Sequence, residues 1–176
     1  MMKYTITLDE LIKNAPLMRA GDRILLTGTL YTARDAAHKR LFKLLKENKP
    51  LPFNLTGSAV YYAGPTATPP GRVIGSCGPT TSERMDVFAP KLYDLGMKVT
   101  IGKGGRGADV CDAIVRNRAL YLCATGGAGA LLAGCVKSCE VIAFPELGCE
   151  SIKKLFVENM PLIVGADCIG GNMFHL

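Results

Sequence analysis

Residues 98–124 read KVTIGKGGRGADVCDAIVRNRALYLCA, and this stretch decides the fold class. Residues 98–101 and 119–124 are short apolar runs of the kind that form buried strands, and residues 108–116 between them have a helical pattern. A strand, a helix and a second strand joined by glycine-rich turns are typical of a parallel sheet. The stretch therefore predicts an α/β fold.

The same alternation extends over the rest of the chain, with glycine or proline at nearly every junction. It predicts further strands at residues 22–33, 58–63, 73–76, 140–144 and 162–165. It predicts further helices at residues 8–14, 34–47, 81–95, 128–136 and 150–157. The chain has 176 residues and no internal repeat, which is close to the roughly 150 residues of an average domain. We therefore expect residues 1–176 to form a single domain.

The composition is that of a globular domain. Hydrophobic residues make up 48% of the chain and charged residues 20%, which excludes a disordered or collagen-like chain. The net charge of +6 favours an anionic partner, which could be nucleic acid, an acidic membrane surface, or a small carboxylate or phosphate.

The cysteines and the N-terminal residues indicate a cytoplasmic location. The seven cysteines are dispersed without C-x-x-C spacing, so neither a disulfide framework nor a zinc ribbon is expected. Asp9 and Glu10 stand where a signal peptide would carry its apolar region. Residues 119–136 carry no charge, but four glycines interrupt them. A buried strand followed by a small-residue helix explains that run better than a membrane span does.

Residues 64–71, GPTATPPG, are the most loop-like stretch and hold three of the ten prolines. A stretch this short is no domain linker. A lid or a partner-contact loop is the functional alternative to a plain surface loop.

Three predicted strand-to-helix junctions carry cations or hydroxyls, and such junctions are where open α/β sheets usually bind anions. At the first junction, Arg34 and His38 are four residues apart, so they share one helical face and could converge on a ligand. The alternative is a solvated basic face, because Lys39, Arg40, Lys43 and Lys46 follow. The unperturbed pKa of a histidine suits proton transfer, although a lone helical histidine is more often structural.

The second junction is GPTTSERMD at residues 78–86. Thr80 and Glu83 have capping-box spacing, which alone could account for the threonine. Arg84 lies four residues after Thr80, and its fork-shaped guanidinium suits bidentate binding of a carboxylate.

The third junction, GKGGRG at residues 102–107, has the spacing of a dinucleotide-binding turn. No acidic residue lies between Asp112 and Glu140, where such a site places an acid on the ribose. A turn that lets Lys103 approach a small anion is the better interpretation, and a plain strand–helix turn is the alternative.

In this order, the three junctions resemble the beta subunit, or equivalently the C-terminal domain, of the iron–sulfur-dependent class I fumarate hydratase and L-tartrate dehydratase family. The resemblance covers nearly the whole chain, and GPTTSERMD is its most specific motif. It also includes LTGT at 26–29, ARD at 33–35, YYAGP at 61–65 and GKG at 102–104. Residues 148–152 and 161–167 resemble the closing pattern of the family.

The resemblance implies a swivelling β/β/α fold, in which a mostly parallel central sheet is layered between helices and a second, antiparallel sheet. It implies a hydro-lyase that reversibly hydrates fumarate to (S)-malate. Three cysteines of a separate alpha subunit would hold the [4Fe–4S] cluster, and its open iron would bind the substrate. This chain would then bind no metal itself. It would be active only with that subunit, in a hetero-oligomer of two alpha and two beta subunits.

The resemblance also implies roles for individual residues. Three cations would hold the small dicarboxylate substrate, namely Arg34, Arg84 and Lys103. Thr80 matches the catalytic threonine proposed for the family and would transfer a proton at the carbon next to a carboxylate. His38, together with Asp35, matches an R-D-x-x-H pattern and is the second proton-transfer candidate. The sequence does not decide between the two.

Three alternatives stay open. An L-tartrate dehydratase beta subunit, which would help convert tartrate to oxaloacetate, keeps the family and changes the substrate. A basic nucleic-acid-binding module is motivated by the net charge, but no recognition motif accompanies it, so we expect no nucleic-acid partner. An inactive structural subunit is disfavoured because the cations and the threonine are all present.

Overall fold

The structure is a computed structural model that describes residues 1–174. The strands are β1 Lys3–Thr7, β2 Arg23–Thr32, β3 Ala59–Tyr61, β4 Val99–Gly102, β5 Leu120–Cys123, β6 Val136–Ala143 and β7 Ile152–Ala166. The helices are α1 Leu8–Lys13, α2 Asp35–Lys46, α3 Ala89–Asp94, α4 Ala108–Arg116 and α5 Gly129–Gly134. Short 3-10 helices are η1 Ala15–Leu17, η2 Ser82–Met85 and η3 Pro145–Glu150. No helix within the described range is long and apolar enough to cross a membrane.

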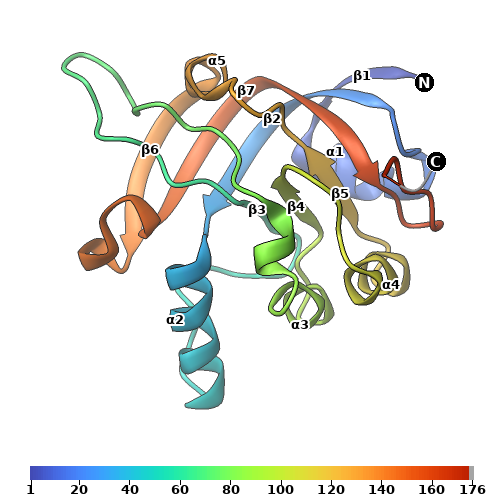
Figure 1. Ribbon diagram of the computed structural model, residues 1–176, viewed down its shortest axis with the longest axis horizontal. Coiled ribbons are helices and arrows are strands. Elements are labelled where there is room, and N and C mark those ends of the chain that lie inside the picture. The colour runs from blue at the N-terminus through green and yellow to red at the C-terminus, as the bar shows by residue number, and fades with distance from the viewer. Residues whose placement is uncertain (175–176) are drawn as a thin grey trace.

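The strands form one sheet in the order β1-β2-β3-β4-β5-β7-β6. Neighbours from β1 to β5 are parallel, whereas β7 runs antiparallel to both β5 and β6. β7 also pairs antiparallel with β2, so the sheet closes on itself. The curved antiparallel part consists of β6, β7 and β2 (Figure 1). The α/β fold with mostly parallel strands and an antiparallel part is therefore confirmed, and the antiparallel part is continuous with the parallel strands.

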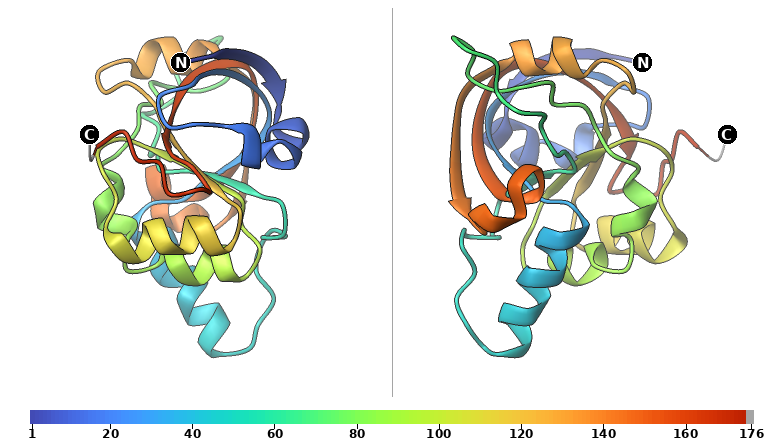
Figure 2. Two further views of the ribbon diagram at one scale, coloured as in Figure 1. Left: turned by 90° about the vertical axis from the view of Figure 1, so that its right-hand side faces the viewer. Right: turned by 60° about the vertical axis from the view of Figure 1, so that its left-hand side comes forward.

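Two hydrophobic clusters pack against opposite faces of the strands, because successive side chains of a strand point to opposite sides. In β3, Tyr61 belongs to one cluster and Val60 to the other. Three helices contribute to the second cluster with Leu41 of α2, Leu92 of α3 and Ile114 of α4. Figures 1 and 2 show these helices together on one side of the strands and α5 on the opposite side. α2 follows β2 and α4 follows β4 in the chain, so both helices begin after strand ends where the sequence predicts the site.

The prediction of a helix at residues 150–157 is wrong, because β7 begins at Ile152. Lysine, leucine and glutamate in this segment favour a helix by propensity. However, the segment pairs with β2 on one side and with β6 on the other, and Leu155 and Val157 are buried. Hydrogen bonding on both edges and burial outweigh the local preference.

Residues 81–95 form η2 and α3 instead of one continuous helix. Pro90 lies in the first turn of α3. A helix continuing through Pro90 would bring its ring against the carbonyl group of Asp86. The proline therefore begins a new helix.

Residues 73–76 are not a strand, and β1 has no counterpart in the predicted elements. Thr66 N–H donates to Ser76 O at 3.0 Å, and Ser76 N–H donates to Thr66 Oγ1 at 2.9 Å. These bonds close the segment between them into a loop. The proline-rich stretch 64–71 belongs to this loop, as the sequence indicates.

Candidate functional site

β2, β3, β4 and β5 are parallel neighbours, so their carboxyl ends meet at one edge of the sheet. Arg34 and Asp35 follow β2, Gly64 follows β3, and Lys103 follows β4. The carboxyl ends of parallel strands are where α/β folds, both open and closed, usually bind ligands.

Asp35 lies between two arginines from different segments. Arg84 Nε donates to Asp35 Oδ1 at 3.1 Å, and Arg84 Nη2 donates to Asp35 Oδ2 at 2.7 Å. Arg34 Nη2 lies 3.9 Å from Asp35 Oδ2 and 3.5 Å from Glu150 Oε1. Arg34 Nε is buried and finds no hydrogen-bond partner among residues 1–174. The Arg84 side chain is 50% exposed, so an incoming anion could reach its guanidinium.

Thr80 and Lys103 lie on two segments whose backbones are hydrogen-bonded to each other. Thr80 N–H donates to Tyr62 O at 2.7 Å, which ties Thr80 to the end of β3. Lys103 N–H donates to Thr80 O at 3.3 Å, and Ser82 N–H donates to Lys103 O at 2.9 Å. The hydroxyl and the ammonium group therefore come from neighbouring segments, and the Lys103 side chain is exposed.

Gly64 leaves space for Arg34, and Gly126 lies at ordinary contact distance from Lys103. A methyl group at position 64 would lie 2.9 Å from Arg34 Nη1, which is closer than van der Waals contact. A methyl group at position 126 would lie 3.9 Å from Lys103 Nζ. Gly126 follows β5, so a fourth strand end contributes to the site. The sequence reasoning did not single out either glycine, because no local pattern links them to a cation.

His38 is placed differently from the expectation that it shares an open face with Arg34. Its side chain is fully buried, and its ring stacks on Phe88 with a centroid distance of 5.3 Å. Nδ1 lies 2.8 Å from Arg34 O, and because a carbonyl only accepts, Nδ1 carries the proton. Burial lowers the pKa of His38 to about 4, so the ring is neutral near pH 7. Its Nε2 has no partner among the described residues.

Comparison of the sequence with known proteins shows the family to which the chain belongs. A model of the family described as Fumarase C-terminus matches residues 2–176. The chain belongs to this family. The L(+)-tartrate dehydratase subunit beta of Escherichia coli is 36% identical over 98% of this chain and 87% of its own length.

Two further relatives differ in length. A putative L(+)-tartrate dehydratase subunit beta of Methanocaldococcus jannaschii is 38% identical over 93% of this chain and 87% of its own length. Fumarate hydratase 2 of Leishmania major is 40% identical over 88% of this chain but only 28% of its own length. The chain therefore spans less than a third of that fumarate hydratase.

The residues that the structure describes do not fit an iron–sulfur cluster. Residues 1–174 contain no group of three or more histidine, cysteine, aspartate or glutamate side chains placed to hold a metal ion. All seven cysteines are free, and they are dispersed over strands, helices and loops.

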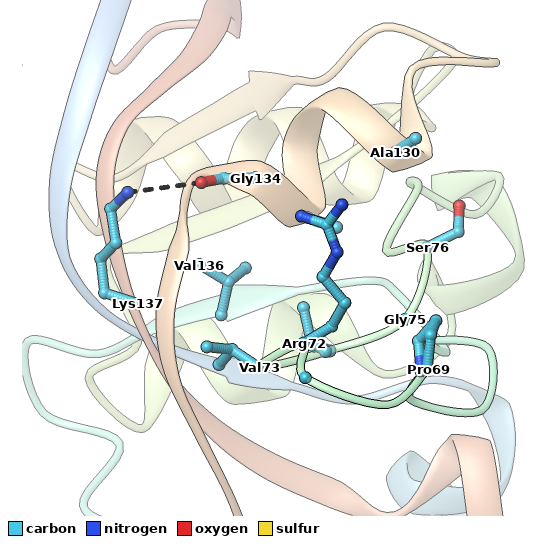
Figure 3. Close-up of a pocket in the computed structure, with 12 residues that line it drawn as sticks. Pro69, Arg72, Val73, Gly75, Ser76, Ala130, Gly134, Val136 and Lys137 are labelled. Carbon is cyan, nitrogen blue, oxygen red and sulfur yellow. Dashed lines mark hydrogen bonds between the residues drawn. The ribbon is translucent and has the colours of Figure 1, made fainter.

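The loop after β3 borders a cavity outside the predicted site. The cavity has a volume of about 500 Å³ and lies between residues 69–76 and α5 (Figure 3). Arg72 extends into it, and Lys137 at its rim donates from Nζ to Gly134 O at 3.4 Å. None of the predicted site residues lines this cavity. The suggestion that the loop acts as a lid or a partner contact stays a prediction.

Glu150 is a site residue that the sequence reasoning missed. Its Oε2 accepts a hydrogen bond from Ala36 N–H at 2.8 Å, which caps the first turn of α2. Its Oε1 faces Arg34 Nη2. No sequence signal could identify this cap, because Glu150 and α2 are far apart in the chain.

Proposed function

We propose that this chain is the beta subunit of a hydro-lyase that reversibly hydrates fumarate to (S)-malate. One observation carries the proposal: Arg34 and Arg84 converge on Asp35, and Thr80 and Lys103 are backbone neighbours, on segments that follow the parallel strands. A four-carbon dianion loses its hydration on binding and needs fixed positive groups in return. The segments after β2 and β4 and the segment 78–86 supply these groups from different directions.

Arg34, Arg84 and Lys103 are proposed to hold the two carboxylates. Thr80 is proposed to move the proton at the carbon next to one carboxylate. A threonine hydroxyl is a weak base at neutral pH, so it depends on nearby cations and on exact placement of the substrate. Lys103, whose backbone N–H donates to Thr80 O, is proposed to supply such a cation.

Asp35 and His38 were expected as catalytic residues, and their contacts suggest supporting roles. Asp35 engages the fork of Arg84, and His38 bonds to the backbone oxygen of Arg34. In this proposal Asp35 aims Arg84 at the substrate, and the neutral His38 ring fixes the backbone of Arg34. Both residues then act through an arginine.

We further propose that an alpha subunit completes the site and ligates the [4Fe–4S] cluster, in a complex of two alpha and two beta subunits. The exposure of Arg84 and Lys103 supports this, because a dehydration site must exclude water. The beta-subunit names of two relatives that match over most of their length support the same arrangement. A cytoplasmic location, with no nucleic-acid or membrane partner, belongs to the proposal.

L-Tartrate dehydration to oxaloacetate is the second candidate. The relatives that match this chain over 87% of their own length are named as L(+)-tartrate dehydratase beta subunits. The two substrates are both four-carbon dicarboxylates, so the same three cations suit either. Residues on the alpha subunit would then decide between them.

The test measures anaerobic fumarate hydration and L-tartrate dehydration by this chain alone and after reconstitution with its alpha subunit. We expect turnover only in the mixture. Lys103→Ala should abolish most of it, whereas Lys137→Ala, which removes an exposed cation outside the site, should not. Inactivity of a stable, cluster-loaded complex toward both substrates would refute the proposed reaction.

A further inference from the structure

The turn at residues 102–107 carries a second cation, Arg106, whose side chain is only 1% exposed. Arg106 Nε donates to Asp86 Oδ1 at 2.7 Å, and Nη1 donates to Thr100 Oγ1 at 3.0 Å. Its guanidinium carbon lies 5.4 Å and 4.9 Å from two ring centroids, those of Tyr62 and Tyr121. Hydrogen bonds at its edge and contacts with two aromatic rings hold this buried guanidinium in one orientation.

Asp86 connects this arginine to the segment that carries Thr80 and Arg84. Its Oδ1 accepts from Arg106, and its Oδ2 accepts from Gly107 N–H at 2.7 Å. Asp86 follows Arg84 by two positions, and Arg106 follows Lys103 by three. The Asp86–Arg106 ion pair therefore joins segment 78–86 to segment 102–107, the two segments that carry Thr80, Arg84 and Lys103.

Tyr121 of β5 makes a second connection closer to Lys103. Its hydroxyl donates to Gly104 O at 2.7 Å and lies 2.9 Å from Ser82 Oγ. Because the single phenolic proton goes to the carbonyl, the Ser82 hydroxyl is the donor in the second bond. Burial raises the pKa of Tyr121, so the phenol stays protonated.

Hydrogen bonds from Tyr121 and Ser82 hold the backbone at Lys103 in place. Gly104 O, immediately after Lys103, is bonded to Tyr121, and Lys103 O itself accepts from Ser82 N–H at 2.9 Å. Ser82 also contacts Gly102, where a methyl group would clash with its hydroxyl. One phenolic hydroxyl thus contacts both segments at the point where Lys103 enters the site.

We propose that Tyr121 is a positioning residue, whose hydroxyl, backed by the ring contact with Arg106, fixes the backbone from which the Lys103 side chain projects relative to Thr80. The inference rests on the proposed function, since it concerns the placement of a substrate-binding cation. Tyr121 does not itself reach the substrate, because its side chain is fully buried. In this proposal its effect passes through Lys103.

Tyr121→Phe is the test variant, because it removes the hydroxyl and keeps the ring beside Arg106. Tyr93→Phe is the matched control. The Tyr93 hydroxyl is equally buried and bonds to Thr100 Oγ1 at 2.6 Å and to Leu120 O at 3.2 Å. Thr100 Oγ1 also accepts from Arg106 Nη1, so a difference between the two variants reports on the bonds of the Tyr121 hydroxyl to Gly104 and Ser82 rather than on Arg106.

The first measurement is amide hydrogen exchange of the full chain, which needs no enzymatic activity. We expect Tyr121→Phe to speed the exchange of the Lys103 and Ser82 amides by about tenfold over Tyr93→Phe. Equal exchange at these amides in the two variants would overturn the proposal. This outcome stands even if the reconstituted wild-type complex hydrates neither substrate, which would count only against the proposed function.

The second measurement is a double-mutant cycle in the reconstituted complex. Tyr121→Phe should lower kcat/KM by about fivefold to tenfold in the wild-type background and leave it unchanged in a Lys103→Ala background. A general structural defect would lower kcat/KM equally in both backgrounds. That result would show that Tyr121 does not act through Lys103.

Discussion

The side chain of Asp35 determines how much of the charge of two arginines is available to a ligand. It forms a bidentate pair with Arg84 and lies within 3.9 Å of Arg34. A dicarboxylate that binds here must either displace Asp35 from Arg84 or use the donors that remain. The planar fork matters in both cases, because it offers paired N–H donors to a carboxylate that displaces Asp35 and further donors to one that binds beside it.

Arg84→Lys should therefore impair turnover although the charge is kept. A lysine has no fork to hold Asp35 and a substrate carboxylate together, so we expect kcat/KM of the complex to fall by about 10-fold to 100-fold. Arg116→Lys is the control, because Arg116 forms a similar bidentate pair with Asp94 between α3 and α4. Unchanged kinetics for Arg84→Lys would remove the bidentate role.

His38 should make stability depend on pH. The unfolded chain binds a proton at His38 below about pH 6.5, whereas the folded protein does so only below about pH 4. The stabilisation is therefore complete above the unfolded pKa and is lost as the pH falls toward 4. Between pH 7 and pH 5 we expect a loss of about 2 kcal/mol in the free energy of unfolding.

Denaturant titrations at the two pH values measure this loss. His38→Asn keeps a donor for Arg34 O but cannot titrate, so its loss between pH 7 and pH 5 should be smaller by that amount. The same loss in the variant and the wild type would assign the effect to other groups.

At the scale of elements, close backbone contacts hold α5 against the segment that leads to Thr80. Gly129 O accepts from Cys77 N–H at 3.0 Å. A methyl group at position 129 would clash with Ser76 Oγ and lie 3.1 Å from Gly78 N. The glycine at the start of α5 is thus a requirement of packing.

Gly129→Ala should lower the free energy of unfolding by about 1–3 kcal/mol, because the backbone of Gly78 must move. Gly134→Ala in the same helix is the matched control. A methyl group at position 134 meets no atom within 4 Å, so this variant should be neutral or more stable by about 0.5–1 kcal/mol. Urea unfolding compares the two, and equal stabilities would contradict the packing argument.

At the scale of the whole molecule, β7 connects the parts of the sheet. It pairs with β2, β5 and β6, and its side chains contribute to both hydrophobic clusters. Loss of β7 would leave edges of β2, β5 and β6 unpaired and would expose both hydrophobic clusters. We therefore expect the chain to unfold in one cooperative transition.

Leu155→Ala tests this expectation. Leu155 is fully buried, and truncating it should cost about 2–5 kcal/mol in the free energy of unfolding. Far-ultraviolet circular dichroism and the near-ultraviolet signal of the tyrosines should shift together to lower denaturant. Lys154→Ala at the neighbouring exposed position should shift neither, and separate transitions for the two signals would argue against a single unit.

The prediction at residues 150–157 shows where local patterns fail. Its lysines, leucine and glutamate favour a helix, but two strand partners that lie far away in the chain determine its structure. The break at Pro90 was visible in the sequence, since proline disrupts a continuous helix by itself. The loop at residues 66–76 needed a bond between Thr66 and Ser76 that no periodicity reveals.

Local patterns in the chain are sufficient to predict the α/β alternation and the family, because strand and helix periods and motif residues are local properties. They also identify Arg34, Thr80, Arg84 and Lys103 as residues of one candidate site. Three features appear only in the folded protein: Asp35 engages Arg84, Glu150 caps α2 and His38 is buried. Those contacts join distant segments, and they depend on the closure of the sheet and on packing, which local patterns do not encode.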